Sequence, residues 1–384
     1  MIVSGVLFLL GGLASCSSPA SNSGDSSDGA GTSVALPLTS SSSSASATWV
    51  TLAMGHLDDP LDTFWQLVTL PAGGQRWALA TPPGVASNGG LVLSVGAGAS
   101  VLAGFEPSQD LLVSPLAESS DQGATWQQGV LPGGLARGPD ALASSGGAAI
   151  ALLRQAGGTV VQSGGGLAGW RVLVTESALA RATSASGCGM EGLTAVGVTA
   201  GGTVGAPMVG SACAHGDGPG IFERSGTGWQ SVGPVLPGVA GPTEVVRLLG
   251  TGRGATALVA AHSGGVADLI ALWSDDGAQR WTVSSRLALA GGTVIATGST
   301  ADGGLVVTYR TTGRLAAAVI HQASLGWQNL APPPAGTAAV VATPEGGFDA
   351  LVSNLAVLEV YALGGGEWTH TQSLSVPIQY GSSG

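Results

Sequence analysis

Tryptophan recurs along this chain at nearly regular intervals, each time after a glycine-containing, turn-forming stretch. The recurring residues are Trp77, Trp126, Trp170, Trp229, Trp281, Trp327 and Trp368, and the steps between them are 49, 44, 59, 52, 46 and 41 residues. These steps are longer than solenoid repeats and close to the roughly 40 to 50 residues of a four-stranded propeller blade. The spacing therefore predicts a β-propeller. Seven marks favour seven four-stranded blades, with six or eight as the alternatives.

The stretches between the tryptophans favour strands over helices. Short runs such as LVLSVGAG, AAIALLRQ and GLVVTYR lie between Gly-Gly, Pro-Gly or Asp-Gly pairs, which is typical of antiparallel strands joined by tight turns. The chain has 65 Gly and 20 Pro, and no stretch after Thr48 holds apolar residues at helical spacing without a Gly break. We therefore expect an all-β domain over residues 48–384.

One of the turns is more specific than the others. Residues 119–126 read Ser-Ser-Asp-Gln-Gly-Ala-Thr-Trp, which resembles the Asp box of sialidase-like propellers, S-x-D-x-G-x-T-W. The resemblance implies a structural turn in which Ser119 and Asp121 bind backbone N–H groups, Gly123 takes a positive φ, and Thr125 and Trp126 complete the motif. Ser274-Asp275-Asp276-Gly277 before Trp281 is a degenerate copy, with one residue too many between Gly and Trp.

The N-terminus predicts export. Residues 2–13 form an uncharged apolar run of signal-peptide length, too short to cross a bilayer. It ends in Leu13-Ala14-Ser15-Cys16, which resembles the lipobox of bacterial lipoproteins, although no Lys or Arg precedes the run. The resemblance implies a signal peptide over residues 1–15, lipidation of Cys16, and anchoring on the outer face of the cell membrane or in the cell envelope. A secretory signal with Cys16 as a bystander is the alternative.

The residues that follow predict a flexible tether. Residues 16–47 are mainly Ser, Gly, Ala and Thr, so little apolar burial would offset the entropy of ordering them. We expect a disordered segment that holds the propeller about 30 Å from the lipid headgroups.

The first blade then lacks a strand, because only Thr48–Ala53 and Phe64–Leu70 precede the strand with Trp77. We predict that the tail, Ser375–Tyr380, supplies it by strand exchange.

The charge balance excludes one class of partner. All twelve basic residues are Arg, against 23 acidic residues, for a net charge of −11. Nucleic-acid affinity depends largely on basic contacts to phosphate, so we expect no nucleic-acid partner.

The remaining cysteines predict a disulfide, because a pair in an exported protein is normally oxidised. A hairpin centred on Ala200 and Gly201 would place Cys188 directly opposite Cys213, as bridge geometry requires.

Two sequences that resemble catalytic or nucleotide-binding motifs are better explained as turns between strands. Ala261-His262-Ser263-Gly264-Gly265 resembles a hydrolase nucleophile elbow, and residues 250–255 resemble a dinucleotide-binding loop, but each leads into a strand instead of a helix. The five histidines are scattered, so we expect no metal site. Residues 56–62 and 215–217 could supply oxygen ligands for calcium, although solvated turns are the simpler interpretation. We therefore assign no cofactor and no catalytic residue.

These observations favour a binding protein over an enzyme. The sialidase family carries an Arg triad, a Tyr/Glu nucleophile pair and an F/Y-R-I-P motif, and that motif is absent here. Our leading hypothesis is a lipid-anchored, monomeric propeller that acts as a non-catalytic binding or scaffold module for a protein or a glycan. The alternatives are a divergent sialidase-like glycoside hydrolase, which would need Arg and carboxylate groups converging on the propeller axis, and an assembly factor for a membrane complex.

Overall fold

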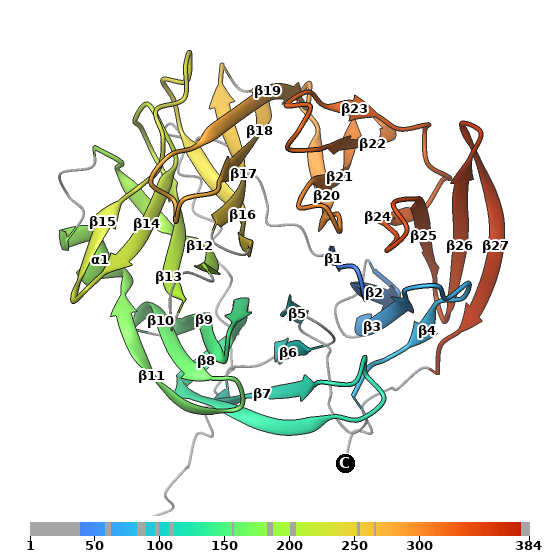
Figure 1. Ribbon diagram of the computed structural model, residues 1–384, viewed down its shortest axis with the longest axis horizontal. Coiled ribbons are helices and arrows are strands. Elements are labelled where there is room, and N and C mark those ends of the chain that lie inside the picture. The colour runs from blue at the N-terminus through green and yellow to red at the C-terminus, as the bar shows by residue number, and fades with distance from the viewer. Residues whose placement is uncertain are drawn as a thin grey trace, which may run out of the picture. The chain divides into compact units, whose positions relative to one another are not determined.

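The computed structural model describes residues 39–57, 63–82, 90–96, 100–106, 111–155, 157–182, 187–199, 205–251, 254–264 and 266–377. All of them belong to the larger of two units of the chain, Gly31–Gly384. Within these residues the regular structure is almost entirely strand, with one short helix, α1 (Glu176–Ala182) (Figure 1). The all-β prediction is confirmed.

The strands group into antiparallel sets of four that follow the chain order. The first sets are β1 (Thr39–Ser43), β2 (Ala47–Gly55), β3 (Thr63–Pro71) and β4 (Ala78–Leu79); β5 (Gly90–Val95), β6 (Val101–Glu106), β7 (Leu111–Ser119) and β8 (Gln127–Ser145); and β8, β9 (Ala148–Gln155), β10 (Gly158–Gly165) and β11 (Ala168–Thr175). The long β8 belongs to two sets, because its first part pairs with β7 and its last part with β9.

The remaining strands repeat the pattern. They are β12 (Met190–Thr199), β13 (Ala206–Cys213), β14 (Gly220–Ser225) and β15 (Gly228–Ser231); β16 (Thr243–Thr251), β17 (Gly254–Ser263), β18 (Val266–Ser274) and β19 (Thr282–Ala288); β20 (Thr293–Ser299), β21 (Leu305–Thr311), β22 (Arg314–Ile320) and β23 (Gln328–Asn329); and β24 (Thr337–Ala342), β25 (Phe348–Asn354), β26 (Val357–Gly364) and β27 (Glu367–Ser375).

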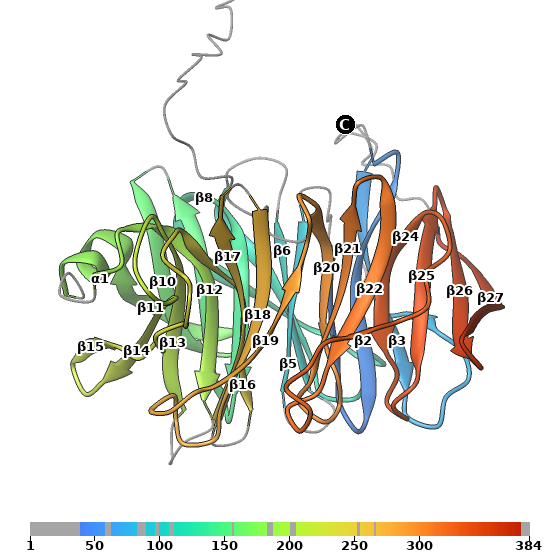
Figure 2. The same cartoon turned by 90° about the horizontal axis from the view of Figure 1, so that it is seen from above.

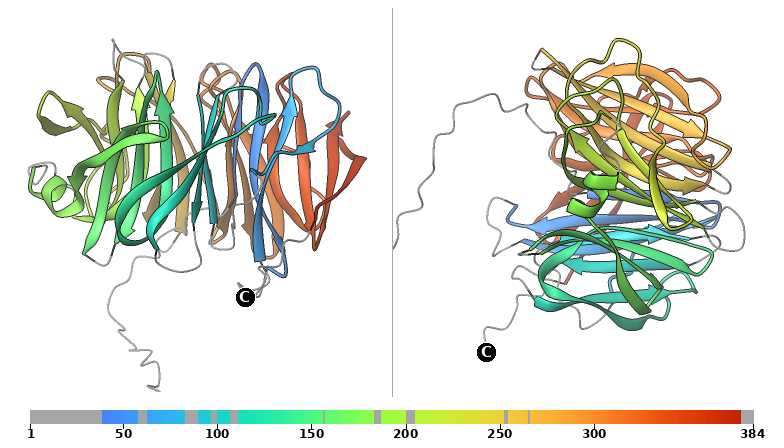
Figure 3. Two further views of the ribbon diagram at one scale, coloured as in Figure 1. Left: turned by 90° about the horizontal axis from the view of Figure 1, so that it is seen from below. Right: turned by 90° about the vertical axis from the view of Figure 1, so that its left-hand side faces the viewer.

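Within this unit the sets stand round a common axis, with the first strand of a set nearest the centre, as at β1, β5, β16 and β20 (Figure 1). Seen from the side, the strands run roughly along that axis (Figures 2 and 3). This is the arrangement of a β-propeller, as the tryptophan spacing predicts. The number of blades stays a prediction.

Strand β17 shows how the sets hold together. Its first nine residues are all buried, and alternate side chains pack into different clusters: Leu258 and Ala260 on one face, Ala257 and Val259 on the other. A central strand covered on both faces needs this run of small and medium apolar residues. Full burial of a Val or Leu side chain contributes about 1.5 to 3 kcal/mol.

The position of strand β1 shows that the predicted extent of the tether was wrong. Its sequence, TSSSS, lies inside residues 16–47, yet it pairs antiparallel with β2 and parallel with β20. Its hydroxyls also find partners, since Ser42 Oγ lies 3.1 Å from Ser299 Oγ and Ser43 Oγ lies 2.8 Å from Thr48 Oγ1. Polar composition predicted disorder here, but backbone ladders on both sides satisfy the strand. The folded domain therefore includes Thr39–Ala47.

Strand β1 also shows that the predicted ring closure, by strand exchange with the C-terminal tail, was wrong. β1 is the strand that the first set was missing, so the set does not borrow one from the tail. The tail begins with Ser375, the last residue of β27, which pairs with Val357 of β26. Val376 follows by donating its backbone N–H to the Ala356 carbonyl at 2.7 Å. Residues 378–380 lie outside the described residues.

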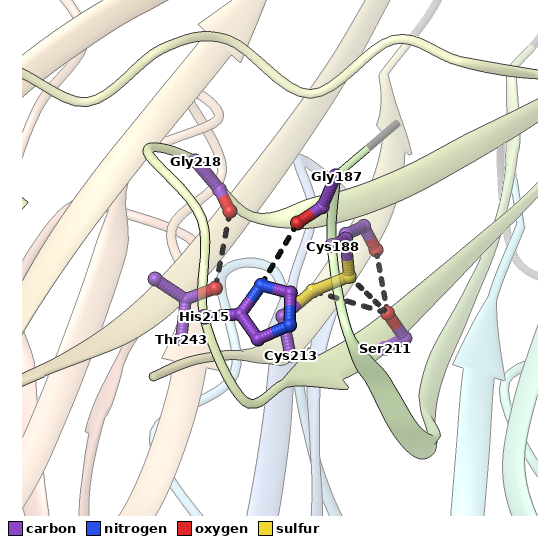
Figure 4. The surroundings of a disulfide bond; sticks show 8 residues. Gly187, Cys188, Ser211, Cys213, His215, Gly218 and Thr243 are labelled. Carbon is purple, nitrogen blue, oxygen red and sulfur yellow. Dashed lines mark hydrogen bonds between the residues drawn. A yellow bond between two sulfur atoms is a disulfide. The ribbon is translucent and has the colours of Figure 1, made fainter. Parts of the chain in front are cut away.

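The disulfide between Cys188 and Cys213 is present, with the two Cα atoms 5.3 Å apart (Figure 4). The predicted register was wrong, because Cys213 lies opposite Met190 and the β12–β13 pairing contains two irregularities. Cys188 instead precedes β12 and reaches Cys213 from outside the strand. Beside the bridge, His215 Nδ1 donates to the Gly187 carbonyl at 3.0 Å, which ties the two loops together.

Candidate functional site

The inner strands surround a cavity of about 750 Å³. Its lining comes from strands far apart in the sequence, among them β5, β8, β12 and β16, with Ser40 of β1 and Thr297 of β20. A cavity of this volume lies within the range of small-molecule sites in proteins. We take it as the candidate functional site.

A second, smaller cavity of about 50 Å³ fixes the direction of the lining strands. Earlier residues of β5 and β12, such as Gly90 and Glu191, line the large cavity, whereas the later residues Val95 and Val198 line the small one. The inner strands therefore run from the large cavity toward the small one. We call the end at which these strands begin the mouth.

Five carboxylates line the large cavity: Glu176, the first residue of α1, and four others that come from successive strand sets at the mouth. Asp140, Glu191 and Glu244 lie early in the inner segments of β8, β12 and β16, and Glu106 ends β6 opposite Gly90, the first residue of β5. A Cβ atom at Gly90 would lie only 2.5 Å from Glu106 Oε2, so glycine leaves room for this carboxylate. We call Glu106, Asp140, Glu191 and Glu244 the acidic arc.

One member of the acidic arc has a cationic partner. Asp140 Oδ1 lies 3.6 Å from Arg154 Nε, and Asp140 Oδ2 accepts the Arg154 backbone N–H at 3.1 Å. Burial raises the pKa of Asp140, and Arg154 opposes that rise. Arg154 also lines the cavity, so this pair is part of its charged wall.

Arg247 lies at the opposite end of the large cavity and also lines the small one, so it forms the floor between them. Its guanidinium donates to the Thr297 carbonyl at 2.8 Å, to Thr297 Oγ1 at 3.2 Å and to the Ser41 carbonyl at 2.6 Å. These bonds connect β16 to β20 and β1. Burial lowers the pKa of Arg247 to about 10, which leaves the group charged at neutral pH.

The sequence did not lead us to the acidic arc or to Arg247, although an enzyme was expected to need Arg and carboxylate groups on the propeller axis. The residues are dispersed along the chain, and no local motif contains two arc members. One signal was available, because Glu191 and Glu244 each stand at the second position of a strand that begins a set. Aligning the strands by blade would have placed them at one level.

The predicted tryptophans contact neighbouring sets in a recurring way. The indole N–H groups of Trp281, Trp327 and Trp368 donate to the carbonyls of Val232, Ser285 and Ala331, each at the outer side of the preceding set. Trp77 makes the equivalent contact to the last set, donating to Asp349 Oδ2 at 2.8 Å. Trp126 packs edge-on against Trp49, and Trp170 and Trp229 pack against apolar clusters.

The turn at residues 119–125 has the hydrogen bonds expected from its sequence. Gly123 N–H donates to Ser119 Oγ at 2.8 Å, and Asp121 accepts both the backbone N–H and the hydroxyl of Thr125. These Thr125 bonds, followed by the Ser119 hydroxyl, hold the pKa of Asp121 below its usual value. Gly123 has φ +86°, as predicted. The turn lies at the end of β7 and not in the cavity, so it carries structure; its membership of the Asp-box family stays a resemblance.

Ser274 and Asp276 repeat this turn despite the extra residue. Ser274 Oγ accepts the Ala278 N–H at 3.0 Å, and Asp276 Oδ1 accepts the Arg280 N–H at 2.9 Å. Ala278, with φ +63°, takes a left-handed conformation.

The catalytic motifs that we set aside are turns here. Ser263 ends β17 and pairs with Val266 at the start of β18, so the elbow-like sequence is a hairpin. Thr251 ends β16 and Gly254 begins β17, which leaves no helix start for a phosphate. Within the described residues, no group of three His, Cys, Asp or Glu side chains is placed to hold a metal ion. Asp58–Asp62 of the calcium candidate lies outside them.

A surface cluster on β26 and β27 has the residue types of a hydrolase triad. Ser373 Oγ lies 3.2 Å from His370 Nε2, and Glu359 Oε2 lies 2.5 Å from the same nitrogen and 2.6 Å from Ser373 Oγ. The Ser373 and His370 hydrogen bonds lower the pKa of Glu359. A catalytic relay needs the acid and the nucleophile on different ring nitrogens, so this triangle cannot act as one.

The N-terminal predictions fall outside the described residues. These include the signal peptide, Cys16 and the tether up to residue 38. None of the helical structure from Thr39 onward that the structure describes is long and apolar enough to cross a bilayer.

Comparisons with known proteins support the fold. No family model matches the sequence, and no curated protein matches it. Among solved structures, a protein from Lactobacillus plantarum matches with a TM-score of 0.53 and 15% identity, over 86% of this chain and 96% of its own. A proposed 6-phosphogluconolactonase from Bacteroides fragilis matches with a TM-score of 0.53 and 16% identity, over 85% and 95%. At such identities the likeness shows the β-propeller fold alone.

Proposed function

We propose that this protein is a lipid-anchored, exported binding or scaffold module that receives a protein or glycan ligand at the mouth of the central cavity. Cys16 carries the lipid in this proposal, and the protein acts as a monomer. One observation carries the proposal: a cavity of about 750 Å³ with a charged lining lies on the axis of the fold. The disulfide between Cys188 and Cys213 supports an oxidising location.

The experiment is to block the mouth without disturbing the fold. Gly192 lines the cavity, and a Cβ atom built there meets no heavy atom within 4 Å, so a Gly192→Trp side chain would enter the cavity. Gly364, at the end of β26, has the same open surroundings but lies away from the cavity, which makes Gly364→Trp the matched control. Partners of the full-length chain would be captured from the native envelope and, separately, from a glycan array.

Loss of a partner in Gly192→Trp, with retention in Gly364→Trp, is the expected result. Equal capture by both variants would place binding outside the cavity and contradict the proposal.

A divergent glycoside hydrolase is the second candidate, because carboxylates and Arg247 do converge on the axis. Against sialidase chemistry, no tyrosine is found in the cavity lining within the described residues. Tyr309 is buried between strand sets and Tyr361 lies on β26 beside His370. A panel of fluorogenic glycosides and sialosides decides: turnover that Gly192→Trp abolishes would establish an enzyme.

A further inference from the structure

The central cavity carries charges of opposite sign at its two ends. At the mouth, Glu191 and Glu244 occupy second positions of β12 and β16, and Glu106 and Asp140 add two more carboxylates. At the floor, Arg247 lines both cavities. Only Arg154 and Arg247 supply positive charge to the described lining, and Arg154 is paired with Asp140.

The hydrogen bonds of Arg247 leave its charge without an anionic partner. All of its acceptors are neutral: the carbonyls of Thr297 and Ser41 and the Thr297 hydroxyl. From Thr39 to Pro377, as far as the structure describes them, no carboxylate oxygen lies within 4.0 Å of its nitrogens. Guanidinium groups bind carboxylates through paired N–H donors, and Nε of Arg247 donates no hydrogen bond to a described residue.

We propose that this cavity binds a small zwitterion of the amino-acid class, with its carboxylate on Arg247 and its ammonium group at the acidic arc. The proposal rests on the proposed function in placing the ligand in the cavity. A ligand with only a negative charge would have to pass the carboxylates of the mouth. A ligand with only a positive charge would satisfy the mouth but leave the guanidinium without an anion.

The first experiment separates the two charges of the ligand. Isothermal titration calorimetry of the full-length protein would compare 6-aminohexanoate with hexanoate and hexylamine, which each keep one charged group. The same comparison with 4-aminobutanoate, butanoate and butylamine tests a shorter separation of the charges. We expect at least one zwitterion to bind about tenfold or more tightly than both of its singly charged analogues.

Two variants assign the ends of the ligand. Arg247→Gln should remove the advantage of the zwitterion over the amine, and Glu191→Gln should reduce its advantage over the carboxylate. Arg171→Gln, at an exposed position on β11 away from the cavity, is the control and should change neither ratio. Because Arg247 also joins β1 and β20, Arg247→Gln could unfold the protein. In that case Glu191→Gln, at the cavity entrance, still tests the proposal.

The outcomes separate this inference from the proposed function. If either singly charged analogue binds as tightly as its zwitterion in both series, or if no probe binds, the inference is overturned. It is also overturned if a zwitterion binds equally well to the wild type and to folded Arg247→Gln and Glu191→Gln proteins. Partner loss in Gly192→Trp would still uphold the proposed function in those cases, whereas equal partner capture by both tryptophan variants would overturn the proposed function.

Discussion

The contact between Trp77 and Asp349 joins the first strand set to the last. The substitutions Asp349→Ala and Asp349→Asn should have sharply different effects on the free energy of unfolding. Asp349 is buried, and its Oδ2 accepts the indole N–H of Trp77 at 2.8 Å. Gln372 fixes the same residue by accepting the Trp77 backbone N–H and donating to its carbonyl. Asp349→Ala leaves the buried indole N–H without an acceptor, which we expect to lower the free energy of unfolding by about 1 to 3 kcal/mol.

Asp349→Asn keeps an acceptor and removes a buried charge. Burial raises the pKa of Asp349 from its ordinary value of 3.8; the Trp77 hydrogen bond opposes that rise, and Glu345 adds to it. A raised folded-state pKa means that the folded protein binds the proton more tightly than the unfolded chain. The wild type therefore loses stability as pH rises from about 3.8 through the raised pKa, and the Asn variant escapes that loss.

The assay is urea unfolding, followed by tryptophan fluorescence, at several pH values between 4 and 7. The Asn variant should match or exceed the wild type at pH 7, and its advantage should shrink toward pH 4. The Ala variant should be the least stable at every pH. Equal destabilisation by Asn and Ala would refute the reasoning, because it would show that the contact needs the charge and not merely an acceptor.

Three further predictions test other parts of the fold. Reducing the disulfide, or replacing both cysteines by serine, should cost about 3 kcal/mol in urea unfolding, since the bridge closes a 25-residue separation. Gly123→Ala should lower the melting temperature more than Gly277→Ala: both positions have positive φ, but only at Gly123 would Cβ lie 2.9 Å from Trp49. Ser41→Pro should destabilise the protein by about 3 kcal/mol in the same unfolding assay, because β1 is paired on both sides, whereas Ala45→Pro, at an exposed position between β1 and β2, should not.

The fold was predictable because its repeating contacts use a rare residue. Trp281, Trp327 and Trp368 each donate to a carbonyl of the preceding set, so a regular structural step appears as a regular step in the sequence. The first strand was not predictable from composition. Thr39–Ser43 resembles a linker in composition, and its place depends on backbone ladders to β2 and to β20, a strand far from it in the sequence.

The candidate site was less predictable than the fold, for a related reason. Each inner strand contributes only part of the lining, so Glu106, Asp140, Glu191 and Glu244 meet only when the ring is formed. Arg247 also lies beyond an irregularity in the β16–β17 pairing, between Val245 and Arg247. Alternation counted from Glu244 would put Arg247 on the opposite face of the strand, so simple strand periodicity points the wrong way.

Ring closure uses the same kind of contact as three of the joints between neighbouring sets. At three other joints, those of Trp281, Trp327 and Trp368, the indole donates to a backbone carbonyl of the set before it, and Trp77 donates to the last set through a carboxylate, Asp349. Thr48 Oγ1 to the Ala342 carbonyl and Ser353 Oγ to the Ala53 carbonyl add side-chain bonds across the same joint. The described residues exchange no strand between the two ends, so these side-chain bonds and the hydrogen bond from the Gly55 backbone N–H to the Leu355 carbonyl, at 3.1 Å, hold this joint. The parallel β1–β20 ladder joins the first set to the set before the last. Arg247 at the cavity floor donates to both strands of that ladder, so loosening the ladder should also weaken ligand binding at the floor.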